Sequence, residues 1–144
     1  MKSLTFRDVD ALCVRRRKYV SDDFPWFGYG AAFRRHVNGV LRERKIELRD
    51  MPVADYFASC YEDGAFAERV AATFSDVFSL DCMFLDPKDE IAALLYGRSE
   101  QFEAVDFCME IRRMFGVDVT DLLLDRASTF GQLVDFLAHQ TCNR

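Results

Sequence analysis

A helical repeat of large apolar residues is the feature that most constrains how this chain can fold. In "AFAERVAATFSDVF", residues 65–78, apolar side chains return every three or four positions, at Phe66, Val70, Phe74, Val77 and Phe78. This spacing places them along one face of an α-helix, which must be buried against other elements. Similar periods recur along the chain, and alternating β-branched segments are scarce. With only three prolines and seven glycines in 144 residues, the sequence predicts an all-α fold.

Boundary signals place the other helices, because proline favours a helix start, glycine a helix end, and serine or threonine an N-cap. The expected helices cover residues 5–20, 31–48, 53–63, 99–115 and 129–140. Gly64 and Gly116 are interpreted as the residues that stop the third and fourth of these helices. Ile46 is assigned to the buried face of the second. The aromatic segment 21–30 is expected to be a loop that packs down, and a helical turn is expected within 117–129.

The charge is unevenly distributed along the chain. Residues 1–50 hold 12 basic and 7 acidic residues, whereas residues 51–144 hold 7 basic and 17 acidic residues, so a net charge of +5 is followed by one of −10. Together with the apolar patterns, this asymmetry predicts two regions: a basic, aromatic-rich helical extension over 1–64 and a helical bundle over 65–144. An acidic chain without an aromatic binding platform argues against nucleic-acid binding.

Membrane and secretion signals are not found in the sequence. No apolar run approaches the roughly 20 residues that cross a bilayer, and the first 20 residues lack the apolar core of a secretory signal. We therefore expect no membrane insertion and a cytoplasmic location.

Residues with catalytic or metal-binding chemistry do not form a known motif. The five cysteines are odd in number, widely spaced and without a CxxC pair, and there are only two histidines, so neither a zinc site nor a disulfide framework is indicated. The chain also lacks a glycine-rich phosphate loop. Adjacent carboxylates such as Asp89 and Glu90 are expected to be solvated charges or helix caps. These observations predict that the protein is not an enzyme and binds no metal ion.

The C-terminal half resembles the acyl carrier protein family over residues 66–140. "FEAVDFCMEIRRMFGVDV" is similar to the second helix of that family and its exit, and "TDLLLDRASTFGQLVDFLA" is similar to the third helix and the start of the fourth. Residues 65–78 then correspond to the first helix. The resemblance implies a four-helix bundle with a long first loop.

The family carries 4′-phosphopantetheine on the serine of an Asp-Ser-Leu motif at the start of the second helix. In the gapless register this motif falls on Glu100, Gln101 and Phe102, and glutamine has no hydroxyl to form the phosphodiester. The resemblance therefore implies that the attachment site has been lost and that no cofactor is bound. Ser99 lies two positions earlier, about 200° around the helix axis, and is interpreted as an N-cap. The alternative is a functional carrier, modified with 4′-phosphopantetheine at Ser99, that serves fatty-acid or polyketide-type synthesis.

The family also binds its partner proteins through an acidic second helix. Here that helix starts acidic, but Arg112 and Arg113 stand where the family usually has acids. Val105 and Met109 match apolar partner-contact positions, and either core packing or partner contact explains them. The predicted partner-binding residues are Glu100, Val105, Asp106, Met109, Arg112 and Arg113. The sequence thus predicts a non-enzymatic protein-interaction module, such as an adaptor, a regulator or an immunity-type binding protein.

Overall fold

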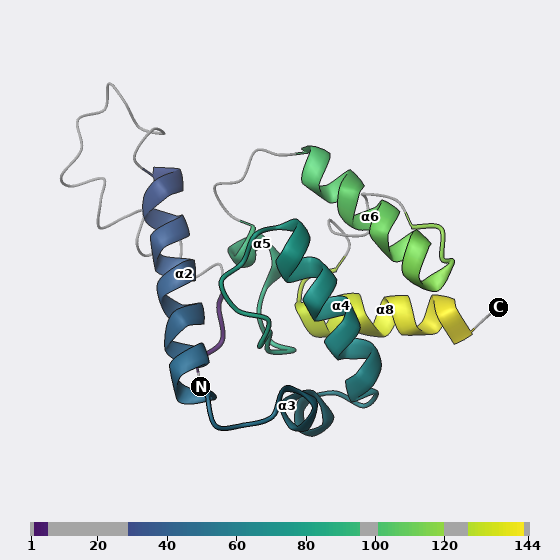
Figure 1. Ribbon diagram of the computed structural model, residues 1–144. Helices are drawn as coiled ribbons and strands as arrows, with labels where there is room; N and C mark the ends of the chain where they lie inside the picture. The colour runs from purple at the N-terminus through teal and green to yellow at the C-terminus, as the bar shows by residue number, and fades with distance from the viewer. Residues whose placement is uncertain (1, 6–28, 96–100, 120–126, 143–144) are drawn as a thin grey trace.

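The computed structural model describes residues 2–5, 29–95, 101–119 and 127–142, without the side chains of 29–34, 101–102 and 142 (Figure 1). Every regular element in these ranges is a helix, as the sequence predicts. The helices are α2 (Tyr29–Glu47), α3 (Val53–Cys60), α4 (Gly64–Val77), α5 (Ile91–Leu94), α6 (Gln101–Phe115) and α8 (Phe130–Cys142). The predicted helix over 5–20 lies outside the described residues, apart from residue 5. So do most of the aromatic segment 21–30 and residues 120–126 of the segment 117–129, in which a helical turn is predicted.

Helix α4 is the centre of the packing. It contacts α3, α6 and α8, and Figure 1 shows it crossing the middle of the molecule, with α3 near its N-terminal end. The ring of Phe74 lies 4.6 Å from that of Phe78, 5.5 Å from that of Phe107 on α6 and 5.5 Å from that of Phe130 on α8, centroid to centroid. All four rings are buried. The helical repeat that predicted α4 therefore also holds α6 and α8 against it.

The interpretation of Gly64 as a helix stop is wrong, because this residue begins α4. The carboxylate of Asp63 caps the helix by accepting a 3.1 Å hydrogen bond from the amide of Phe66. A Cβ atom at position 64 would lie 2.7–2.9 Å from backbone atoms of Phe57 and Ala58 in α3. Glycine is therefore required here for the close approach of α3 and α4 rather than for a helix end.

Helix α2 corrects a second prediction, since Ile46 is 67% exposed and Arg44 is buried in its place. Val37, Leu41 and Arg44 follow the spacing of one helical face, and all three are buried. Residue 46 lies about 200° around the axis from residue 44, so it points away from that face. The buried face of α2 thus ends in a guanidinium group.

Arg44 forms a buried ion pair with Asp89, which is neither the solvated charge nor the helix cap that the sequence suggested. Nη1 donates to Oδ2 at 2.6 Å and Nη2 donates to Oδ1 at 2.5 Å. The guanidinium also donates to the carbonyl oxygens of Phe84 and Lys2, at 3.1 and 2.7 Å. Burial lowers the pKa of Arg44, but the hydrogen bonds and charge of Asp89 outweigh this effect and leave that pKa above its usual value.

Asp89 also connects segments that are distant in the sequence. Its carboxylate accepts hydrogen bonds from the backbone amides of Leu4, at 2.8 Å, and Asp86, at 2.9 Å. Its own carbonyl oxygen accepts from the amide of Phe130 at the start of α8, and the carbonyl oxygen of Leu4 accepts from Glu90. The side chain of Leu4 lies in the core. One hydrophobic core therefore includes residues from both 1–64 and 65–144.

Helix α4 ends in a Schellman motif that places Ser79 at a φ of 53°. The amide of Leu80 donates to the carbonyl oxygen of Ser75 at 2.8 Å, and that of Ser79 donates to Asp76 at 3.3 Å. Glycine is the usual residue at this left-handed position, because a Cβ atom is disfavoured there.

The substitution Ser79→Gly is therefore expected to raise the free energy of unfolding by about 0.5–1 kcal/mol, since relief of the left-handed strain exceeds the entropic cost of glycine. Urea unfolding measures this change, and Ser79→Ala, which keeps the strain, serves as the control. A loss of stability in Ser79→Gly would mean that the serine side chain makes a favourable contribution of its own.

Candidate protein-interaction surface on helix α6

Helix α6 is fixed to the hydrophobic core by its inner face. Phe107 and Ile111 are completely buried, and the ring of Phe107 packs against Phe74 and Phe78 of the α4 segment. These contacts set the rotation of α6 about its own axis. The residues on its opposite side are consequently directed away from the core.

The C-terminal part of α6 has additional contacts with α4. The ring of Phe115 lies 4.9 Å from that of Phe66, and the guanidinium carbon of Arg69 lies 4.7 Å from the centre of the Phe115 ring. Thr73 Oγ1 donates to the sulfur of Met114 at 3.0 Å. The helix then ends at Gly116, whose φ is 67°, as the sequence predicts. A surface on α6 is thus carried by a well-supported element.

The exposed side of α6 carries two large apolar residues. Val105 is 45% exposed and Met109 is 63% exposed. The sequence left core packing or partner contact open for these two residues. The structure places both at the surface and not in the core, and partner contact stays a prediction. We call the exposed residues that follow the helical spacing around them the outer face of α6. It consists of Val105, Asp106, Met109, Arg112 and Arg113.

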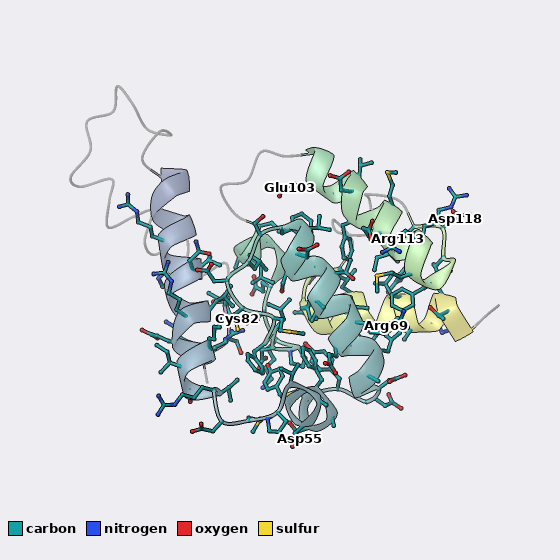
Figure 2. All side chains as sticks on the ribbon, viewed as in Figure 1. Asp55, Arg69, Cys82, Glu103, Arg113 and Asp118 are labelled. Atoms are coloured by element: carbon teal, nitrogen blue, oxygen red, sulfur yellow. The ribbon has the colours of Figure 1, made fainter. Side chains whose placement is uncertain are left out.

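The two arginines of the outer face take part in exposed ion pairs. Arg112 Nε lies 3.0 Å from Asp118 Oδ1, and Arg113 Nη2 lies 2.8 Å from Glu110 Oε2. Figure 2 labels Arg113 and Asp118 at the C-terminal end of α6. Exposed ion pairs of this kind contribute little to stability, because water and salt screen them. Both guanidiniums can therefore exchange their present partners for others at small cost.

The predicted attachment position lies at the start of α6. Helix α6 begins at Gln101, but the side chains of Gln101 and Phe102 are not described, and Ser99 and Glu100 lie outside the described residues. The lost attachment site, the Ser99 cap and the alternative of a phosphopantetheine on Ser99 all stay predictions. The part of the outer face that the structure describes begins at Val105.

Two further sequence predictions can be compared with the described residues. Among the described residues, no group of three or more histidine, cysteine or acidic side chains is placed to hold a metal ion. No helix in the same part of the chain combines the length and apolar character that a membrane span needs.

Comparisons with known proteins give no family assignment. No protein-family model, no curated protein and no solved structure matches this chain. The likeness to acyl carrier proteins therefore depends on the residue patterns given above. Any function must therefore be argued from the structure of the chain itself. Among the described residues, the outer face of α6 is the part of the predicted binding surface that the structure defines.

Proposed function

We propose that this protein is a non-enzymatic helical protein that binds another protein through the outer face of α6. The observation that carries the proposal is the exposure of Val105 and Met109 on a helix whose inward-facing Phe107 and Ile111 are completely buried. Neighbouring exposed apolar residues surrounded by polar ones are typical of protein-binding surfaces. Because α6 is held by the core, little ordering of the helix is needed when a partner binds.

The charges around the apolar pair define the chemistry of the partner. Asp106 lies beside Val105, whereas Arg112 and Arg113 follow Met109 toward the C-terminal end of α6. A complementary partner has an apolar groove for Val105 and Met109, with acidic groups where the two arginines approach. An adaptor, a regulatory subunit or an immunity-type protein that blocks a toxin would each use such a surface.

The proposal includes a carrier-like arrangement that no longer carries a prosthetic group. In support, a helix at Gly64–Val77 is followed by a long connection with the short helix α5, then by α6 and α8. Both α6 and α8 pack on α4. Glutamine at position 101 removes the hydroxyl that the chemistry of attachment requires. In this proposal the second helix has kept partner binding and lost the cofactor.

Charge reversal on α6 tests the proposal. The partner is first captured from the native host with the full chain, identified by mass spectrometry and purified. We expect the pair Arg112→Glu and Arg113→Glu to weaken its binding at least about tenfold in a titration, because two favourable charges become repulsive. The far-UV circular dichroism should stay helical, since both side chains are exposed.

The matched control is the pair Arg42→Glu and Arg49→Glu, which reverses two exposed arginines away from α6. Binding should be unchanged in this variant. If the α6 pair also leaves the affinity unchanged, the binding surface lies elsewhere. The intact mass of the captured chain adds a second check: a phosphopantetheine adduct that Ser99→Ala abolishes would replace the proposal with the carrier alternative.

A further inference from the structure

A cavity of about 600 Å³ lies between the C-terminal ends of α2 and α4 and the connection that follows α4. It has no part in the outer face of α6. Figure 2 labels Cys82, one of its lining residues, between α2 and α4. Its volume is within the range of small-molecule sites, so the chemistry of its walls can be examined for a ligand.

The walls of the cavity are mostly apolar. Val53 at the start of α3 and Leu80, Met83 and Phe84 of the connection contribute large side chains. Phe84 is held in place because its ring packs edge to face on Tyr56, with centroids 5.2 Å apart. The backbone of the connection is fixed at the same point, since Ser75 Oγ donates to the carbonyl oxygen of Cys82 at 3.1 Å. The cavity therefore offers a preformed apolar surface.

Two charged side chains of opposite sign line the same cavity. Lys45 comes from the last turn of α2 and Asp76 from the last turn of α4. Neither side chain has an ion pair within the described part of the chain. A third charged residue, Asp81, is already paired with Arg42 at 3.3 Å. Both side chains are exposed. The cavity thus presents one ammonium and one carboxylate that have no ion-pair partner among the described residues.

The position of Asp76 at the C-terminal end of α4 favours a cation beside it. The C-terminal end of a helix carries partial negative charge, which favours a cation nearby and disfavours a carboxylate. The last turn of α4 contains no basic residue to balance Asp76. Ser79, the residue at a φ of 53°, also lines the cavity. Its hydroxyl offers a hydrogen bond that glycine, the favoured residue at such a position, would not.

We propose that this cavity binds a small zwitterion with an apolar body, the chemical class of apolar amino acids and dipeptides. The ammonium group of the ligand lies at Asp76 and the C-terminal end of α4, and its carboxylate lies at Lys45. The apolar side chains of the ligand contact Leu80, Met83 and Phe84. This inference does not depend on the proposed function of α6.

The test is a titration of the full chain with the dipeptide leucyl-phenylalanine, followed by amide NMR shifts. We expect shifts at residues 79–84 and none on α6. N-acetylation of the dipeptide removes its ammonium, and C-terminal amidation removes its carboxylate. Each derivative should bind roughly tenfold more weakly than the free dipeptide, which corresponds to the loss of one charge-assisted contact of about 1.4 kcal/mol.

Variants connect each ligand charge to one residue. Asp76→Asn should bind the free and the N-acetylated dipeptide equally, and Lys45→Gln should bind the free and the amidated dipeptide equally. Asp135→Asn, an exposed carboxylate on α8, should leave the affinity unchanged. Absence of shifts at 79–84 with millimolar dipeptide, or equal affinities for the free and both modified dipeptides on the native chain, would overturn the proposal.

Discussion

Replacement of Asp89 by alanine is expected to lower the free energy of unfolding by about 3–5 kcal/mol, because it leaves a buried guanidinium without its counter-ion. Asp89 is completely buried and accepts hydrogen bonds from Arg44 and from the amides of Leu4 and Asp86. The substitution thus affects α2, the N-terminal segment and the connection after α4 together. Urea unfolding, followed by circular dichroism, measures the loss.

Two controls separate this effect from an ordinary loss of charge. Asp81→Ala removes the carboxylate of the exposed pair with Arg42 and should cost at most about 1 kcal/mol. The double variant Arg44→Met with Asp89→Leu removes both charges and should be more stable than Asp89→Ala alone. If Asp89→Ala and Asp81→Ala lose similar amounts, the buried pair does not hold these segments together.

Truncation of Phe74 to alanine is expected to cost about 3–5 kcal/mol, the usual range for a large buried aromatic residue. Its ring meets those of Phe78, Phe107 and Phe130, so the cavity left behind opens against α6 and α8 together. Phe136→Ala on α8 is the matched control, because that ring is 39% exposed. It should change stability by about 0.5 kcal/mol. Thermal and urea unfolding measure both losses. If Phe74→Ala and Phe136→Ala lose equal stability, α4 does not have a central place in the core.

The helices were predictable where local signals agree. The period of apolar residues places α4 at 65–78, within one residue of its observed bounds at each end. The last helix also follows the preference of serine and threonine for the N-cap: of the two candidates, Ser128 and Thr129, it is Thr129 whose Oγ1 accepts a hydrogen bond from the amide of Gln132, at 3.2 Å. In both cases the residues that give the signal lie within one or a few turns of each other.

The long-range features had no local signal. Arg44 and Asp89 are 45 residues apart in the sequence, and each alone looks like an ordinary surface charge. Gly64 looks like a helix stop in the sequence. Glycine is needed there because α3 approaches closely, and the residues next to Gly64 carry no signal of that approach. The cavity collects residues from three helices and a connection, so no single segment could indicate it.

The sequence predicted which residues form the outer face of α6, but it could not show that this face is exposed. The spacing of Val105 and Met109 puts them on one side of a helix, but it does not say whether another element covers that side. Only the packing of Phe107 and Ile111 against α4 and its neighbours shows which side of α6 is exposed. Defining the candidate site thus required both the residue pattern of the helix and its rotation against the core.

The most direct test of the central claim is site-specific photo-crosslinking in the native host. A benzophenone amino acid is placed at position 109 on the outer face of α6 and, as the control, at position 136 on α8, since both native side chains are exposed and apolar. We predict that position 109 crosslinks to one defined protein, identified by mass spectrometry, and that position 136 does not. No adduct at position 109, or the same adduct from both positions, would contradict the assignment of α6 as the binding surface.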